Sequence, residues 1–156
     1  MYLSKYNYLS LARRFDWFIN KNILHKTEIR RKLRDVEMYL DLVTPGISST
    51  LAIRKSREDD MVHVMKEVIK PGMTIIDCGS NIGFYPLLEA KILGENGVIY
   101  AIEPDARNYR ILEKNASIAP AGLIKTFNIA VSNRTGKQKM FVADHSNLNK
   151  LASSED

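Results

Sequence analysis

Two acidic residues and two glycines stand where a ligand site is expected. Asp77 lies at the end of an apolar run and leads into the loop Gly79-Ser80-Asn81-Ile82-Gly83, while Glu103 follows the next apolar run. The glycines allow a sharp turn and a close approach of the backbone to a ligand, and amides at the start of a following helix face that ligand. Asp77 can orient the loop or contact a cationic group, and Glu103 can accept hydrogen bonds from both hydroxyls of a ribose. The pattern predicts a site for a ribose-bearing cofactor.

The type of cofactor depends on the loop. Dinucleotide-binding folds use an acid at the position of Glu103 as well, so this residue alone does not choose between NAD and S-adenosylmethionine. The loop reads G-x-N-x-G and lacks the middle glycine that brings a pyrophosphate close. Asp77, two residues before the first glycine, suits the ammonium group of S-adenosylmethionine better than a diphosphate. We therefore expect S-adenosylmethionine. Asn81 either uses its amide toward the ligand or only tolerates a left-handed turn.

The elements that must position this motif alternate between strand and helix. Strands are predicted over 73–78, 98–102 and 125–131, with helices over 84–93 and after Asp105, which is suited to be an N-cap. Such a βαβαβ order predicts an α/β, Rossmann-like, doubly wound parallel sheet. A turn at 133–136 leads into a further strand at 139–142.

The region before the sheet is expected to form a separate arm. The pattern predicts one or two helices between residues 3 and 36, and then a short hairpin with strands at 38–43 and 49–53 around Pro45-Gly46. A helix over 58–69 follows and places four apolar side chains on a core face. We expect two parts: the helical arm with its hairpin, residues 1–57, and a partial cofactor-binding domain, residues 58–156. The four core-face residues are Met61, Val64, Met65 and Val68.

Composition narrows the class of protein. The chain has 156 residues, 45% of them hydrophobic, which is enough for a packed core. Cys78 is the only cysteine, so a disulfide framework and a CxxC zinc site are excluded. No apolar run approaches the roughly 20 residues that a membrane helix needs. A soluble, cytoplasmic protein without a membrane partner is expected.

The positive charge of the chain is concentrated in the arm. The net charge is +5, and residues 1–37 carry nine Lys or Arg against four Asp or Glu. Basic residues crowd the end of the predicted helical arm, where cations suit the negative pole of a helix. A solvated helix end is the simpler interpretation, and an acidic or phosphate-bearing partner is the alternative. The basic residues concerned are Arg30, Arg31, Lys32 and Arg34.

The motif as a whole resembles that of a known family. The segment 71–85, PGMTIIDCGSNIGFY, followed by Tyr100-Ala101-Ile102-Glu103-Pro104-Asp105, is similar to the FkbM-type methyltransferases. The resemblance continues through 130–133, the turn at Gly136 and Ser146-Asn147-Leu148. It implies a class I fold, S-adenosylmethionine as the cofactor, and methylation of hydroxyl oxygens of sugars or natural products.

The resemblance also implies roles for individual residues. The methionine end of the cofactor would lie against Asp77, Gly79, Asn81 and Gly83, and the ribose against Glu103. Three further residues would lie near the adenine: Pro104, Asp105 and Asn128. Ser80 stands where the family usually has alanine. Family members continue into strands with an Asp-[Val/Ile]-Glu-Gly segment that this chain lacks, so the chain resembles an N-terminal portion.

Three functions remain open at this level. The first is an O-methyltransferase, or a piece of one, acting on a small-molecule hydroxyl. The second is a catalytically incomplete module that binds the cofactor or a partner chain, or forms a homo-oligomer through an exposed sheet edge. The third and weakest is an RNA-binding or RNA-modifying protein, suggested by the basic arm. No catalytic base is assigned. His145 is a candidate by type, but a surface role is the simpler interpretation.

Overall fold

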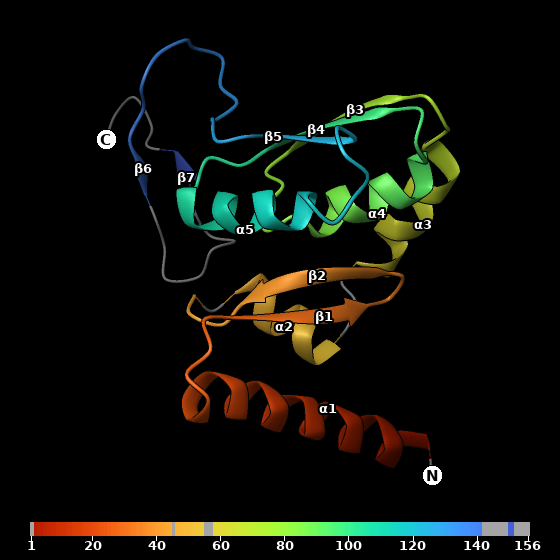
Figure 1. Ribbon diagram of the computed structural model, residues 1–156, viewed down its shortest axis with the longest axis vertical. Coiled ribbons are helices and arrows are strands. Elements are labelled where there is room, and N and C mark those ends of the chain that lie inside the picture. The colour runs from red at the N-terminus through yellow and green to blue at the C-terminus, as the bar shows by residue number, and fades with distance from the viewer. Residues whose placement is uncertain (1, 45, 55–57, 142–149, 152–156) are drawn as a thin grey trace.

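The structure is a computed structural model that describes residues 2–44, 46–54, 58–141 and 150–151. Its elements form layers along the long axis of the molecule (Figure 1). A three-stranded sheet lies at one end, two helices lie beneath it, and a two-stranded sheet follows with the N-terminal helices at the far end. The site motif belongs to the three-stranded sheet.

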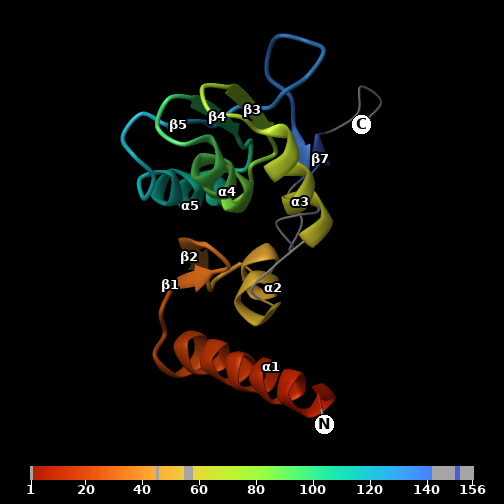
Figure 2. The ribbon, with the colours of Figure 1, turned by 90° about the vertical axis from the view of Figure 1, so that its right-hand side faces the viewer.

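This sheet consists of parallel strands that follow one another in the chain. Strands β3 (Thr74–Cys78), β4 (Val98–Ile102) and β5 (Ile124–Phe127) pair in that order. Helices α4 (Phe84–Leu93) and α5 (Ala106–Ala116) connect them. Because each crossover runs in the same direction along the sheet, both helices cover the same face (Figure 2). The predicted α/β class and parallel sheet are confirmed.

The helices and the sheet share a tight contact at the start of β4. Ala90 and Leu93 of α4 pack against buried Ile99 and against Leu123 before β5. A Cβ atom at Gly97 would come within 2.6 Å of both the Leu93 side chain and a backbone carbonyl oxygen. Only glycine therefore fits this turn without movement of the neighbouring chain.

The first predicted strand, 38–43, overlaps an observed strand, but that strand pairs with the segment before it and not across Pro45-Gly46. Strands β1 (Glu28–Leu33) and β2 (Val36–Asp41) pair antiparallel. The second predicted strand, 49–53, is wrong, because these residues lie in helix α2 (Ile47–Arg54). Buried apolar residues alternate with other residues in β2, and in β1 the buried Ile29 and Leu33 flank the partly buried Arg31 on the same face. The charges at 30–32 concealed that alternation. The buried residues are Ile29, Leu33, Val36, Met38 and Leu40.

The helical arm is accordingly shorter than predicted. Helix α1 (Tyr2–Phe18) and the π-helical turn η1 (Ile19–Ile23) end well before residue 36. The basic cluster lies in β1 and its turn instead of at a helix end, and three of its members have acidic partners: Arg30 with Glu37, Arg31 with Asp16, and Arg34 with Asp59. This pairing leaves less free charge for an acidic partner. No helix in the described part of the chain is long and apolar enough to cross a membrane.

Helix α3 (Asp59–Val68) does not bury the predicted face. Val62 and Met65 are buried, whereas Met61, Val64 and Val68 are 49%, 49% and 60% exposed. The helix lies at the side of the molecule and contacts α4 (Figure 2). It therefore buries only a narrow stripe, and the core-face prediction is wrong for three of its four residues.

The end of the described chain is a small antiparallel pair. Strand β6 (Met140–Phe141) falls within the predicted strand at 139–142, and it pairs with β7 (Lys150–Leu151). Strand β5 ends at residue 127, so the predicted strand at 125–131 is too long at its carboxyl end.

One hydrophobic cluster joins the hairpin to the helices. It includes residues from β1, β2, α2, α3 and α4, together with Ile82 and Ile111. The core therefore contains residues from both sides of position 57. Asn115 of α5 is fully buried within this region and contacts both β2 and the site loop. The loop is thus supported from the layer beneath it.

Candidate functional site

The loop after β3 takes a backbone shape that its residue types allow. Gly79, Asn81 and Gly83 all have positive φ angles, of 82°, 51° and 88°. A left-handed conformation costs little for glycine and is tolerated by asparagine, so Asn81 takes the predicted left-handed turn, and its contact with a ligand stays a prediction. A Cβ atom added at Gly79 would meet nothing within 4 Å, whereas one at Gly83 would lie 2.9 Å from Leu112 Cδ1. Gly79 leaves space for a ligand, and Gly83 allows close helix packing.

The amides of this loop are bonded within the protein. The N–H groups of Gly79 and Ser80 donate to Ile102 O at 2.9 and 3.0 Å, and that of Gly83 donates to Ser80 O at 2.9 Å. The amide of Asn81 donates to a Glu103 carboxylate oxygen at 2.9 Å, and that of Ile82 to Asn81 Oδ1 at 3.0 Å. A phosphate site requires several free amides that converge. The loop from 79 to 83 does not offer them, which disfavours a pyrophosphate.

Glu103 holds the loop in place. It is only 5% exposed. Its Oε2 accepts the Asn81 amide, and its Oε1 accepts the Asp105 amide at 2.9 Å and Asn108 Nδ2 at 3.5 Å. Burial raises the pKa of Glu103, and these hydrogen bonds oppose that rise. The carboxylate ties the ends of β3 and β4 to the start of α5, and its predicted contact with a ribose stays a prediction.

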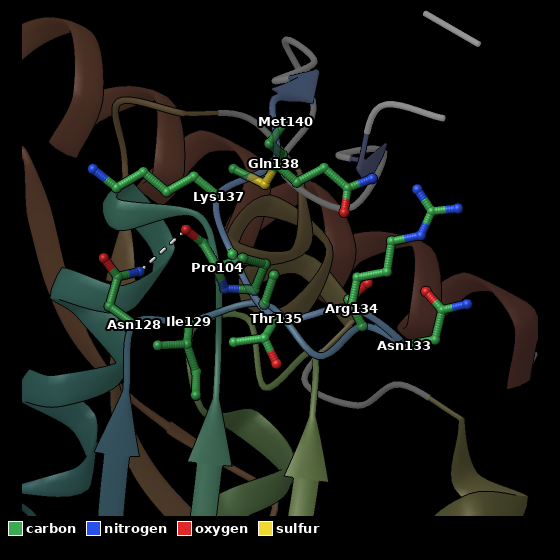
Figure 3. Close-up of a pocket in the computed structure, with 12 residues that line it drawn as sticks. Pro104, Asn128, Ile129, Asn133, Arg134, Thr135, Lys137, Gln138 and Met140 are labelled. Atoms are coloured by element: carbon green, nitrogen blue, oxygen red, sulfur yellow. Dashed lines mark hydrogen bonds between the residues drawn. The ribbon is translucent and has the colours of Figure 1, made fainter. Parts of the chain in front are cut away.

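The three residues predicted near the adenine lie together beyond β4 and β5. Asp105 is the N-cap of α5, since its side chain accepts the Arg107 amide at 2.9 Å, and it forms an ion pair with the same arginine. Asn128 follows β5 and donates to the carbonyl oxygens of Glu103, at 2.8 Å, and Pro104, at 3.1 Å. Figure 3 shows the bond to Pro104. These contacts fix the relative positions of the two strand ends.

A cavity of about 880 Å³ opens next to Pro104 and Asn128 (Figure 3). The segment after β5 forms most of its wall, including Ile129, Arg134 and Lys137. The sequence interpretation missed these wall residues because it extended the strand to 131 and assigned the rest to a turn. The candidate site therefore has two parts: the loop 77–83 at the end of β3, and this cavity beyond β4 and β5.

A second carboxyl group belongs to the first part. Asp77 Oδ2 and Glu89 Oε2 are both buried, and among the described residues neither has a hydrogen-bond partner. Ser80, itself 5% exposed, donates its hydroxyl to the backbone oxygen of Asp77 at 3.0 Å. Burial raises the pKa of Asp77, and a side-chain hydrogen bond with Ser80 opposes that rise. Burial together with the charge of Asp77 raises the pKa of Glu89 to about 8. A glutamate among the apolar residues of 84–93 was a signal of this group that the sequence interpretation did not use.

The remaining sequence expectations concern residues outside the two parts of the candidate site. His145 and the segment 146–148 lie outside the described residues. Within the described ranges, no three His, Cys, Asp or Glu side chains come together in a group that could hold a metal ion.

Comparison with known proteins finds a likeness in fold to solved structures. No protein-family profile and no curated protein sequence matches the chain. Among solved structures, P. horikoshii TYW2 in complex with MeSAdo is similar, with a TM-score of 0.53 and 19% identity over 67% of this chain and 36% of that one. M. jannaschii TYW2 in complex with AdoMet gives a TM-score of 0.52 and 19% identity over 65% of this chain and 42% of that one.

The chain thus spans 36% and 42% of the length of these two structures. The M. jannaschii structure holds S-adenosylmethionine, abbreviated AdoMet. At this level of identity the likeness concerns the fold alone. The described chain shares part of the fold of these two structures, a Rossmann-like α/β fold with a parallel sheet.

Proposed function

We propose that this chain is the cofactor-binding part of an S-adenosylmethionine-dependent methyltransferase of the FkbM type, acting on a hydroxyl oxygen of a sugar or natural product. The observation that carries the proposal is the loop after β3. It combines open space at Gly79 with a buried carboxylate oxygen of Asp77 that has no partner among the described residues. A buried carboxylate without a partner is costly unless a ligand or a proton satisfies it.

The residues present fit this cofactor better than a dinucleotide. The ammonium of its methionine end offers donors to Asp77, and the space over Gly79 admits the ligand close to the backbone. The internally bonded amides of the loop suit a ligand without phosphate. The remaining proposed contacts are Ser80, Asn81 and Gly83 toward the methionine end, Glu103 toward the ribose, and Pro104, Asp105 and Asn128 toward the adenine.

When bound, S-adenosylmethionine supplies an electrophilic methyl group. The described residues contribute binding and orientation, which can account for much of the rate of such a transfer. The cavity beyond β4 and β5 is adjacent to the proposed adenine side. The acceptor is proposed from the family resemblance, and no general base is assigned.

Titration calorimetry with S-adenosylhomocysteine tests the proposal. We expect saturable binding with one site per chain and no binding of NAD at the same concentration. Gly79→Val should weaken this binding, because a branched side chain would fill the open space and would also strain the left-handed backbone. Absence of S-adenosylhomocysteine binding by the folded wild-type chain, or tighter binding of NAD, would refute the proposal.

A second candidate function is supported by the outer face of the sheet. Ile76 is 66% exposed and Phe127 39% exposed. Ile75, Ile99 and Ile124 pack in the cluster that includes α4 residues, so by strand alternation and register Ile76 and Phe127 lie on the opposite face. Exposed apolar residues on a sheet face favour association, here with a second copy of the chain, which would make the chain an oligomerisation module. Size-exclusion chromatography with light scattering distinguishes the two: a dimer that Ile76→Asp dissociates supports the module, and a stable monomer contradicts it.

A further inference from the structure

The carboxyl groups of Asp77 and Glu89 each need a cationic partner or a proton to offset the cost of burial. Asp77 comes from the end of β3, and Glu89 from the middle of α4, where it is 8% exposed among apolar neighbours. Each has one buried oxygen without a hydrogen-bond partner in the described part of the chain. Asp77 and Glu89 are close enough for their charges to repel each other. Without a cation, both cannot stay ionised at low cost, because burial and this repulsion favour one neutral group.

We propose that Asp77 and Glu89 together form a cation subsite for the ammonium group of an amino-acid-bearing nucleoside, and that Glu89 releases a proton to solvent when this group binds. This inference rests on the proposed function. In the free protein the neutral Glu89 carboxyl removes the repulsion. On binding, the Glu89 O–H bond breaks, the proton passes to the buffer, and the new carboxylate accepts a hydrogen bond from the ammonium.

The charge that acts on Glu89 is that of Asp77. Burial is the larger cause that raises the pKa of Glu89, to about 8, and repulsion by Asp77 is the second. The neutral form therefore prevails at pH 7, where an ordinary glutamate is ionised. An arriving ammonium opposes both effects, because it attracts the charged form of Glu89 and supplies a donor for the buried oxygen that has none among the described residues.

Other charged groups near α4 have partners elsewhere or lie in solvent. Helix α4 packs against β2, β4, α3 and α5, and β4 carries no charged side chain. Of the charged groups on these elements and on α4, Asp60, His63, Lys66, Glu67 and Glu113 are exposed. The others pair as Asp59 with Arg34, Glu37 with Arg30, Lys91 with Asp35, Arg107 with Asp105, and Arg110 and Lys114 with Glu28, while Asp41 accepts the Val43 amide.

The test compares two ligands that differ only at the amino-acid end. S-adenosylhomocysteine carries the ammonium, and 5′-methylthioadenosine lacks it. Calorimetry of the wild-type chain at pH 6.5, 7.5 and 8.5 should show the affinity for S-adenosylhomocysteine rising roughly 25-fold over this range, since Glu89 no longer has to lose a proton. The affinity for 5′-methylthioadenosine should stay constant. The ligand's own amino group loses its charge at high pH, which weakens binding and cannot produce this rise.

Proton release gives a second readout. At pH 7 the binding heat of S-adenosylhomocysteine should depend on the ionisation enthalpy of the buffer, with close to one proton released per ligand. Glu89→Gln should abolish both this release and the pH dependence while it leaves 5′-methylthioadenosine binding unchanged. Glu95→Gln, at an exposed position in the turn before β4, is the matched control and should behave as the wild type.

The outcomes separate this inference from the proposed function. If neither nucleoside binds at any pH, both fail. If both bind with the same pH response, or if Glu89→Gln keeps the proton release, the carboxyl pair is not the ammonium subsite and the methyltransferase proposal still stands. The wild-type comparison of the two ligands needs no variant, so a Glu89→Gln chain that fails to fold does not remove the test.

Discussion

At the scale of single residues, side chains of the site motif already make hydrogen bonds that stabilise the fold without a ligand. Glu103, predicted to hold a ribose, already accepts two backbone amides and one side-chain amide. Asp105, predicted near the adenine, is an N-cap. The sequence identified the residues of the motif and their meeting point, because spacing relative to strand ends determines both. The predicted N-cap role of Asp105 is confirmed, whereas the hydrogen bonds of Glu103 depend on loop geometry and could not be predicted.

Glu103 should therefore affect stability as well as binding. Glu103→Gln replaces one carboxylate oxygen by a donor that would face an N–H group, so we expect the free energy of unfolding to fall by about 1–3 kcal/mol. Affinity for S-adenosylhomocysteine should also fall, because the loop loses its anchor. Urea denaturation and calorimetry measure the two effects, with Glu95→Gln as the exposed control. Unchanged stability would show that the hydrogen bonds of Glu103 contribute little.

Glu89 should make the ligand-free protein less stable as the pH rises. Its pKa is raised from 4.5 to about 8 on folding. Between these values the folded chain holds a proton that the unfolded chain has lost, so this contribution is complete below pH 4.5 and is lost as the pH rises to 8. Between pH 5.5 and 8 the free energy of unfolding should fall by about 3 kcal/mol for this reason. Urea denaturation at pH 5.5 and 8 should show this decline in the wild type and a smaller one in Glu89→Gln; an identical decline would contradict it.

At the scale of elements, the sheet was predictable and the arm was not. Strand β4 and helix α4 have the predicted bounds, because continuous apolar runs punctuated by Gly and Pro mark buried parallel elements clearly. The hairpin was predicted too late in the sequence because the charges at 30–32 resemble a helix end. The apolar stripe of α3 was assigned to the wrong face because several apolar faces fit its sequence, and only packing selects one.

Asn115 is the residue that joins these elements. It accepts the Tyr39 amide at 2.6 Å and donates to Tyr39 O and Ile82 O at 2.9 and 2.7 Å. Asn115→Leu would leave all three backbone groups without this partner in a buried region, so we expect a loss of about 3 kcal/mol or more. Thermal and urea unfolding measure it, with the exposed Asn96→Ala as the control. A loss below 1 kcal/mol would mean that water replaces the side chain.

At the scale of the whole molecule, the layers are held together by an ion cluster as well as by the core. Glu28 of β1 lies 2.5 Å from Arg110 Nη1 and also contacts Lys114, both on α5, and its side chain is 12% exposed. Burial raises the pKa of Glu28, but the hydrogen bonds and charges of Lys114 and Arg110 outweigh it, and the net shift is downward. The cluster connects the N-terminal hairpin to the helices beneath the parallel sheet.

Breaking this cluster should weaken the whole molecule only where Glu28 is ionised. A lowered pKa contributes stability above pH 4.5 that is lost as the pH falls through the value in the folded protein. Glu28→Gln should lower the free energy of unfolding by about 1–2 kcal/mol at pH 7 and by much less near pH 3. Glu37→Gln, in the exposed pair with Arg30, should have little effect. Equal losses at both pH values would exclude an ionic origin.

The contact of Asn115 with Ile82 O has a consequence for ligand affinity. The same side chain is bonded to β2 and to the loop that leads into α4, so the loop is ordered when the hairpin docks. A ligand that meets an ordered loop does not spend binding free energy on ordering it. Sequence changes in the hairpin, a full layer away from Gly79, should then alter the dissociation constant without touching the ligand. The N-terminal hairpin therefore lowers the entropy cost of ligand binding, because it orders the site loop before the ligand binds.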